Sequence, residues 1–478
     1  MLFFRLTFWI LSLFCLILIS GCGEKFLDIK HEKSLVIPKT IDDYQSILEY
    51  KIVTSSHEFA IAGADEYFLT DAKWDYFQSQ YSSFYCDLYI WSKANPMAGF
   101  DEYSFPDWPI AYTQIFYSNQ ALAGLEKIKP AAHEKEAYDL AKGAALFLRA
   151  MRYYQLAQLF CPVYTEANLT SPFGLPLRLE PDVTAKVRRS NLGDTYNRIL
   201  ADALEAAALL PQESDRQNHR RPSKAAAYGL LAKIYLVMEK YEEACKYASL
   251  CLELRPELLD FNSLVLTESS VTAPFTFENF SPTGVDNPEM LFYLSLEGSR
   301  NSAFSTFHGG IDTALFQSYE ENDLRKTAFF RPQTETGDVQ SFRGSYTGNN
   351  IYFTGMATDE QYLIRAETHA RAGRVTEAMA DLNHLLKHRY DNDHFTPRSA
   401  STRDAALDQI LAERRKQLLF RGIRWEDLRR LNNDPNRAVT LTRVVHGQVN
   451  ELPPNDVRYM WPLPQSEIDG AGVTQNPR

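Results

Sequence analysis

Residues 225–256, AAAYGLLAKIYLVMEKYEEACKYASLCLELRP, decide the fold of this chain. The first half places aromatic, aliphatic and small side chains at helical spacing, and after a break near Glu239 the second half has a face of small residues. Small residues let two helices approach closely, and Pro256 ends the unit. The spacing matches the tetratricopeptide (TPR) pattern of about 34 residues. Because one hairpin cannot bury its own faces, we expect further hairpins beside it.

Helical patterns continue on both sides of this hairpin. Further helices are predicted at about 108–128, 134–160, 196–210, 405–420 and 422–432, and helices also resume at Thr358. Thr358 and Gln361 have the spacing of a capping box where the helices resume. The sequence therefore predicts a mostly α fold, a TPR-like helical solenoid scaffold with helices over about 108–256 and 358–432.

The helical pattern lapses at about residues 257–357. This stretch is rich in Ser, Thr, Gly, Asn and aromatic residues. FTFENF (275–280) and MLFYLSL (290–296) are predicted as strands or buried runs, and GSYTGNNIYFTG (344–355) as a loop. We expect an irregular, loop-rich lobe inserted between the helical hairpins.

A segment between Glu66 and Trp108 is crowded with aromatic residues that follow no sustained helical or strand period. Some of these rings must pack in the core, but rings in irregular sequence also suit a platform on which sugars or peptide side chains stack. The predicted ligand-binding residues are Trp74, Trp91 and Tyr103 in this segment, and Tyr346 at a loop tip of the inserted lobe.

The N-terminus carries an export signal. Residues 1–21 combine one basic residue with a short apolar run, and Ile19-Ser20-Gly21-Cys22 resembles a bacterial lipobox, which makes Cys22 the predicted lipid anchor. An ordinary secretory signal with a chance cysteine is the alternative. Acyl chains on Cys22 would anchor the protein to a membrane without spanning it. A polar tether over 22–39 then leads to a folded domain over 40–478.

Charge and cysteine content limit the partners, metals and disulfides that we expect for this protein. The formal net charge is -11, and it becomes -12 once Arg5 leaves with the signal, which argues against nucleic acid or an anionic membrane face as the main partner. None of the remaining cysteines has zinc-type spacing. A disulfide between Cys86 and Cys161 is one alternative, and buried free thiols are the favoured one.

Motifs for catalysis and cofactors are missing from the sequence. It contains no Gly-rich phosphate loop, HExxH motif or nucleophile elbow, so we expect no cofactor and no enzyme activity. The run at 391–394 offers oxygen ligands for calcium but lacks the Gly and distal Glu of an EF-hand, which favours a polar turn. The sequence does not decide whether two carboxylates form a glycoside-hydrolysing pair, because the fold sets the distance between them.

Six blocks of the sequence, in order, resemble the signature blocks of the SusD/RagB family. They are FLDIKHEKSLVIPKTIDDYQSIL, AALFLRAMRYYQLAQLFCPVY, AAYGLLAKIYLVMEKYEEA, LIRAETHARAGRVTEAMADLN, ILAERRKQLLFRGIRWEDLRRL and WPLPQSEIDGAGVTQNP. The resemblance implies a helical TPR scaffold with an irregular lobe. It also implies an outer-membrane lipoprotein that binds oligosaccharides or peptides and covers a SusC-like TonB-dependent transporter.

The same resemblance implies that the charged runs at 413–415 and 424–427 form buried ion pairs rather than a catalytic site. One departure is GEKFLD after Cys22, which lacks the acidic run that often directs family members to the cell surface. Two other functions compete with nutrient binding: a TPR scaffold that binds proteins, and a surface glycoside hydrolase. The sequence does not identify the ligand.

Overall fold

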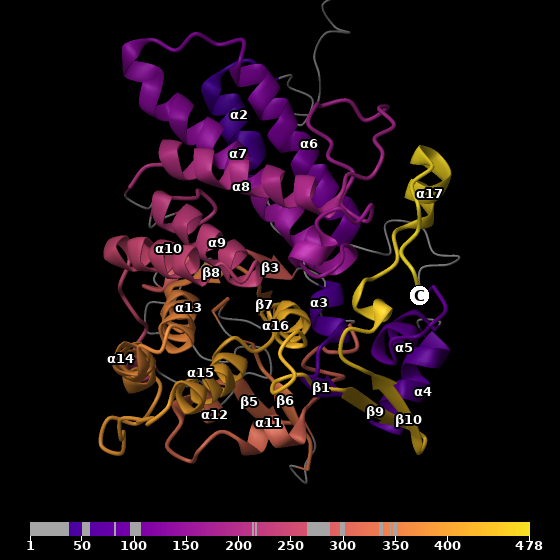
Figure 1. The fold of residues 1–478 in the computed structure, drawn as a ribbon, viewed down its shortest axis with the longest axis vertical. Coiled ribbons are helices and arrows are strands. Elements are labelled where there is room, and N and C mark those ends of the chain that lie inside the picture. The colour runs from indigo at the N-terminus through magenta and orange to yellow at the C-terminus, as the bar shows by residue number, and fades with distance from the viewer. Residues whose placement is uncertain are drawn as a thin grey trace, which may run out of the picture. The chain divides into compact units, whose positions relative to one another are not determined.

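Antiparallel helices make up most of the chain, as Figure 1 shows. The structure is a computed structural model that describes residues 38–49, 58–80, 83–95, 107–212, 215, 218–264, 287–296, 302–333, 338–344, 346–347 and 351–478. Residues from Ile41 to Arg478 belong to one compact unit. The lipobox with Cys22, Tyr103 and the FTFENF run lie outside the described residues.

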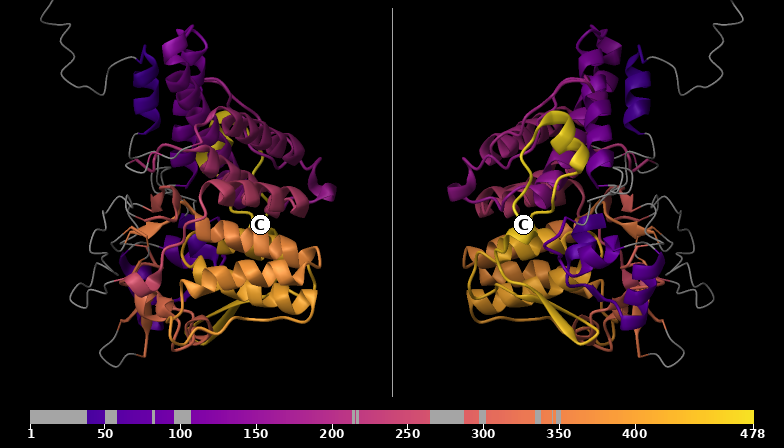
Figure 2. Two further views of the ribbon diagram at one scale, coloured as in Figure 1. Left: turned by 90° about the vertical axis from the view of Figure 1, so that its left-hand side faces the viewer. Right: turned by 90° about the vertical axis from the view of Figure 1, so that its right-hand side faces the viewer.

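The predicted, mostly α fold is confirmed. The main helices are α2 (Ile41–Leu48), α6 (Asp107–Leu125), α7 (Lys135–Phe160), α8 (Leu192–Leu209), α9 (Lys224–Val237), α10 (Tyr241–Leu254), α13 (Thr358–Arg371), α14 (Val375–Lys387), α15 (Arg403–Gln417) and α16 (Arg424–Leu431). Helix α7 packs between α6 and α8, and its residues 143–154 are all buried. Figure 2 shows the later helices stacked in layers against the α9–α10 hairpin. None of the helices in the described part of the chain combines the length and apolar composition that crossing a membrane requires.

The α9–α10 hairpin closes through small residues, as its sequence predicts. Ala232 of α9 and Ala244 and Ala248 of α10 are fully buried in one cluster with Ile364 of α13. The absence of larger side chains lets the two helices approach, and α13 supplies the neighbour that a single hairpin lacks.

Replacing Ala232 by Leu should therefore overpack this contact and lower the free energy of unfolding by roughly 1–3 kcal/mol. Ala208→Leu is the matched control, because Ala208 is exposed on α8 and has room for a larger side chain. Urea denaturation followed by circular dichroism measures both variants. Equal stability of Ala232→Leu and wild type would contradict the close packing of this hairpin.

The predicted capping box at the start of α13 is wrong. Ala357 is the N-cap residue, and it makes no side-chain cap. Thr358 lies inside the helix, where its hydroxyl donates to the Glu289 carbonyl oxygen at 3.3 Å. Because the lobe provides this buried acceptor, the Thr358 side chain bonds to the lobe instead of capping the helix.

The inserted lobe consists of short antiparallel strand pairs and short helices. They are β2 (Met290–Phe292), β3 (Ser295–Leu296), β4 (Gly310–Ile311), α11 (Thr313–Gln317), α12 (Leu324–Phe329), β5 (Phe330–Pro332), β6 (Gln340–Phe342), β7 (Tyr352–Phe353) and β8 (Met356–Ala357). Strand β2 pairs with β8, β3 with β7, and β5 with β6. The predicted strand run at 290–296 therefore supplies two strands of the lobe.

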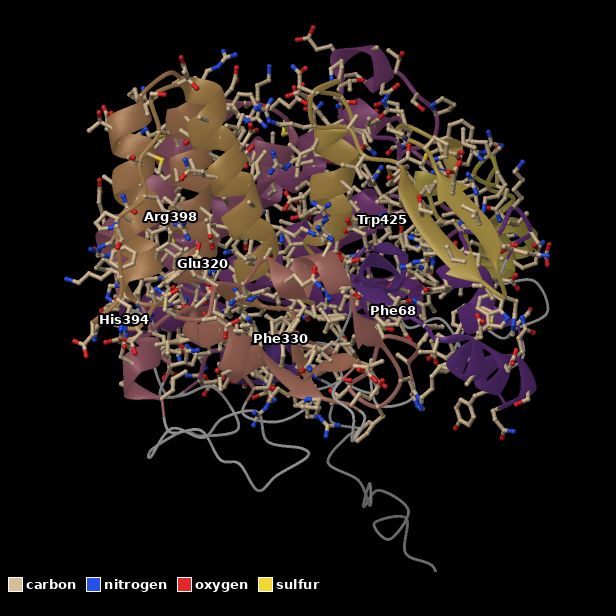
Figure 3. The ribbon with its side chains drawn as sticks, turned by 90° about the horizontal axis from the view of Figure 1, so that it is seen from below. Phe68, Glu320, Phe330, His394, Arg398 and Trp425 are labelled. Carbon is tan, nitrogen blue, oxygen red and sulfur yellow. The ribbon has the colours of Figure 1, made fainter. Side chains whose placement is uncertain are left out.

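The aromatic N-terminal segment folds as short elements around the lobe. It contains α3 (Glu58–Gly63), β1 (Tyr67–Phe68), α4 (Asp71–Gln80) and α5 (Phe84–Tyr89). Strand β1 pairs with β4 of the lobe, with Phe68 opposite Gly310. A Cβ on Gly310 would lie 2.7 Å from the Phe68 ring, so only glycine allows this approach. Figure 3 shows Phe68 where the two segments meet.

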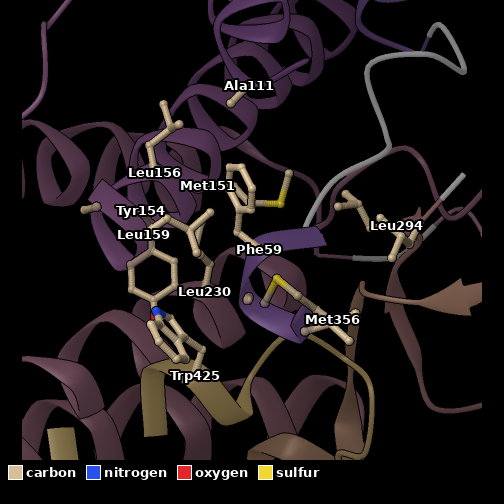
Figure 4. Packing of buried hydrophobic residues seen from close by; sticks show 14 of the residues in the cluster. Phe59, Ala111, Met151, Tyr154, Leu156, Leu159, Leu230, Leu294, Met356 and Trp425 are labelled. Carbon is tan, nitrogen blue, oxygen red and sulfur yellow. The ribbon is translucent and has the colours of Figure 1, made fainter. Parts of the chain in front are cut away.

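A tryptophan pair lies at the centre of the core. Trp425 of α16 stacks on Trp461 at 5.5 Å, and Phe59 of α3 stacks on Trp461 at 5.4 Å. Figure 4 shows the Tyr154 ring beside Trp425 and the Phe59 ring beside Met151. The core thus joins α3, α7 and the C-terminal helices, which fixes the N-terminal segment to the scaffold. The chain closes with β9 (Leu441–Val445), β10 (Gln448–Leu452) and α17 (Gln465–Ala471).

The four described cysteines are free thiols, and Cys86, Cys161 and Cys251 are buried. The favoured interpretation of their sequence pattern is confirmed for these three, and the alternative Cys86–Cys161 disulfide is absent. Cys245 differs because it is partly exposed.

Candidate ligand-binding site

Helix α4 exposes an aromatic surface instead of burying it. Phe77 is its only buried residue, and the Tyr76 side chain is 40% exposed. Among the residues that the structure describes, Tyr76 is the only Phe, Tyr or Trp that is more than a third exposed. Most exposed large apolar side chains in a protein are aliphatic or isolated, whereas a supported aromatic ring suits ligand stacking.

The Tyr76 ring lies on a residue of the inserted lobe. It stacks on the His308 ring at 5.4 Å between centroids and 24° between planes. Phe77 meets the same imidazole edge-on at 5.0 Å, and the Lys73 ammonium donates to the Phe307 carbonyl oxygen at 3.1 Å. We call Lys73, Tyr76 and His308 the α4 platform. Two segments more than two hundred residues apart in the sequence therefore build one surface.

His308 is a neutral partner in this stack at pH 7. Burial, together with the charge of Lys73, lowers the pKa of His308 to about 4. Its Nδ1 is buried and has no hydrogen-bond partner among the described residues. The platform thus presents an exposed aromatic ring backed by a neutral imidazole, which is the kind of surface on which a polyhydroxylated ring stacks.

Trp74 lies two residues before Tyr76 on α4, so its side chain projects from another side of the helix. Its ring is partly buried against the core and lies 6.0 Å from the Tyr89 ring. Cys86 Sγ contacts the Trp74 carbonyl oxygen at 3.7 Å, which fixes the backbone of α4 on α5. Of the predicted ligand-binding residues that are described, Trp74 is the one whose ring is not fully buried.

Trp91 is a core residue, so the expectation of an accessible ring there is wrong. Its side chain is 1% exposed, and its indole nitrogen donates to the Gly63 carbonyl oxygen at 2.9 Å. The Arg443 guanidinium lies 4.6 Å from the Trp91 ring and 4.1 Å from the Tyr89 ring. The irregular sequence around Trp91 suggests an exposed ring. In the structure Arg443, which comes from the distant strand β9, covers that ring.

Tyr346 is also buried, and the predicted exposed loop tip is wrong. Its exposure is 0%, and the Arg421 guanidinium lies 4.5 Å from its ring. Its hydroxyl donates to Asp359 Oδ2 at 3.1 Å and to the Glu289 carboxylate. Tyr346 therefore belongs to a buried polar network between the lobe and the scaffold.

The charged runs near the C-terminus are structural ion pairs, as the family resemblance implies. Arg414 Nε lies 2.8 Å from Asp427 Oδ2, and Arg424 Nε lies 2.7 Å from Asp65 Oδ1. Glu413 accepts a hydrogen bond of 2.7 Å from the buried Arg325. Each of these carboxylates is therefore paired with a guanidinium group.

A buried carboxyl at the start of α3 has an unusual acidity. Burial raises the pKa of Glu58 to about 7, although hydrogen bonds from Ser302 and Tyr85 oppose the rise and the neighbouring Asp107 adds to it. Asp107 accepts the backbone N–H groups of Glu58 and Phe59 at 3.1 and 2.7 Å. The pair ties α3 to the start of α6, and both carboxyls are buried.

A hollow with a volume of 590 Å³ lies elsewhere on the molecule. Its walls include Glu320, Tyr390, His394 and Arg398, three of which Figure 3 labels. Arg398 bonds to both Glu320 and Tyr390, and the Tyr390 ring is buried. The hollow thus offers paired charges and no open ring.

The run at 391–394 beside this hollow is a polar turn, as its sequence favours. Asp391 Oδ1 accepts the backbone N–H of Asp393 at 2.9 Å and lies 3.0 Å from His394 Nδ1. Among the described residues, no cluster of three or more His, Cys, Asp and Glu side chains has a geometry that could hold a metal ion.

Comparisons with family models and with known proteins agree on one family. Residues 25–236 match the sequence family described as "Starch-binding associating with outer membrane", and residues 338–478 match the SusD family. SusD-like protein P2 of Formosa agariphila is 24% identical over 414 residues, which cover 76% of this chain and 77% of that protein.

Solved structures show the same fold. A putative sugar binding protein from Bacteroides vulgatus superposes with a TM-score of 0.71 at 19% identity, covering 92% of this chain and 99% of that one. A SusD superfamily protein from Bacteroides thetaiotaomicron superposes with a TM-score of 0.70 at 20% identity, and the match covers 92% of this chain and 100% of that one. A SusD-like carbohydrate binding protein from Bacteroides fragilis superposes with a TM-score of 0.65 at 16% identity, and the match covers 92% of this chain and 99% of that one.

Proposed function

The chain belongs to the SusD family, and from this premise we propose that it binds an oligosaccharide at the outer membrane without cleaving it. The observation that carries the proposal is the exposed Tyr76 ring on the neutral His308 imidazole. Sugar rings present C–H groups on their faces and hydroxyl groups at their edges. The Tyr76 ring would stack on one face of the sugar, while the sugar hydroxyls stay at the edge of the ring.

The descriptions of related proteins support a carbohydrate ligand. The matched family is described as starch-binding, and one structural neighbour is described as a carbohydrate binding protein. The sequence resemblance leaves a peptide as the other class of ligand. Binding of the mature chain to an array of glycans and peptides distinguishes the two, and we expect glycan binding. Chromatography of the bound glycan after long incubation should reveal no shorter products.

The proposed partner is a SusC-like TonB-dependent transporter, which would receive the glycan. The predicted lipid anchor at Cys22 and the family membership of the chain support this pairing. Affinity purification from detergent-solubilised outer membranes should recover a large barrel protein together with the chain. Recovery of the chain alone, or with soluble helical proteins, would favour a general protein-binding scaffold instead.

Cys22 is the proposed lipid anchor, and its removal should release the protein. Cys22→Ala deletes the thiol that carries the acyl chains, so we expect either unprocessed precursor or protein in the soluble fraction. Membrane fractionation with labelled fatty acid measures the outcome. Cys86→Ala is the matched control, because that thiol is buried. Undiminished acyl labelling of Cys22→Ala would refute the assignment.

A further inference from the structure

A cysteine, a histidine and an arginine meet where α10, α13 and the start of α14 lie together (Figure 1). Cys245 Sγ lies 3.8 Å from an Arg374 guanidinium nitrogen and 3.9 Å from His369 Nδ1. Cys245 is partly exposed, and Arg374 is exposed. The sulfur therefore faces a positive charge at a position that solvent and small molecules can reach.

Hydrogen bonds hold the guanidinium in this position. Arg374 Nε donates to His369 Nδ1 at 3.0 Å, so that ring nitrogen carries no proton in this arrangement. The other ring nitrogen of His369 lies 3.9 Å from Asp381 Oδ2. Asp381 is held in turn by Arg365 through two bonds of 2.8 and 2.6 Å. His369 is thus a positioning residue that aims Arg374 at the sulfur.

The other described cysteines are buried, and burial dominates their acidity even where arginines lie nearby, as Arg189 and Arg429 do at Cys161. Burial raises the pKa of the Cys86 thiol to about 12, that of Cys161 to about 11 and that of Cys251 to about 12. Burial also acts to raise the pKa of Cys245, but its polar contacts and the positive charge of Arg374 outweigh it and lower the pKa. A thiolate is the reactive form of cysteine, and nearby cations favour it.

We propose that Cys245 is a reactive thiol that exchanges with low-molecular-mass disulfides, forming a mixed disulfide on the outer surface of the hairpin. The Cys245 thiolate attacks one sulfur of the disulfide, the S–S bond of the small molecule breaks, and its second half leaves as a thiolate that takes up a proton. One disulfide replaces another, so the exchange needs no oxidant or metal. The site is separate from the α4 platform and does not depend on glycan binding.

The test is the reaction of the folded mature chain with the aromatic disulfide DTNB, followed from pH 5 to 9. We expect one fast equivalent, which tryptic mass spectrometry assigns to the peptide spanning residues 241–246. Cys245→Ser should abolish it. Arg374→Ala should move the midpoint of the pH–rate profile upward and slow the reaction at pH 7 about tenfold, because a shift of one pKa unit changes the thiolate fraction tenfold.

Lys246→Ala is the matched control, since Lys246 is a cation next to Cys245 in sequence that lies over the Tyr247 ring instead of the sulfur. Its rate should stay within about twofold of wild type, because an exposed charge without contact is largely screened. His369→Ala should resemble Arg374→Ala, because it frees the guanidinium. The proposal is overturned if another described cysteine reacts first, or if Arg374→Ala leaves both midpoint and rate unchanged.

Discussion

Asp359→Ala is expected to lower the free energy of unfolding by about 3–5 kcal/mol, the largest loss of stability that we predict. Both oxygens of the Asp359 carboxylate accept from Arg421, at 2.8 and 2.7 Å, and Gln417 donates to it at 2.7 Å. Asp359 and Arg421 are both buried. Removing the carboxylate leaves the guanidinium buried without its counter-charge, and this unpaired charge is the source of the cost.

The comparison with an exposed ion pair makes this prediction specific. Arg403 and Asp404 lie 3.3 Å apart, and the Asp404 side chain is 61% exposed. Asp404→Ala should cost less than about 1 kcal/mol, because water replaces the lost contact. Chemical denaturation of both variants gives the two free energies directly. Similar small losses for both would mean that Asp359 does not hold the lobe to the scaffold.

Tyr76→Ala is expected to weaken glycan binding by about 2 kcal/mol, or about 30-fold in Kd. The ring is already held in place by His308 and Phe77, so little ordering cost is incurred when a sugar stacks on it. Its removal deletes that contact area and leaves the fold intact, since the ring contributes to the surface of α4. Isothermal calorimetry with a glycan identified on the array measures the loss.

Leu204→Ala provides the control for this measurement. Leu204 on α8 is 40% exposed, equal to Tyr76, but it lies on the scaffold away from the α4 platform. Its replacement should leave glycan affinity unchanged. If both variants bind as well as wild type while remaining folded by circular dichroism, the ligand does not contact α4, and the site must be sought on another surface.

The scaffold was predictable because its helices bury most of their length. Residues 225–256 combine periodic apolar residues with small ones, and both features act locally on helix formation and pairing. The same holds for α7, whose two apolar faces correspond to packing against α6 and α8. The start of α13 was misread, because the acceptor for Thr358 comes from Glu289 in the lobe.

The site was predictable only as a region. The aromatic segment and the inserted lobe do meet, but the rings that are accessible depend on long-range contacts. Arg443, which covers Trp91, and Asp359, which accepts from Tyr346, carry no local signal of these contacts. Helix α4 shows no clear apolar period because only Phe77 is buried, so Tyr76 could not be distinguished from its aromatic neighbours. Nothing in the sequence around His308 indicates that a tyrosine lies on it.

The most direct measurement of glycan binding on the α4 platform is a glycan and peptide array probed in parallel with wild type and a Trp74→Ala/Tyr76→Ala double variant. Wild type should bind a set of glycans on the array. The folded double variant should bind none of these glycans, and neither protein should bind the peptides. Retention of peptides alone, or the same glycans bound equally by both proteins, would contradict this prediction.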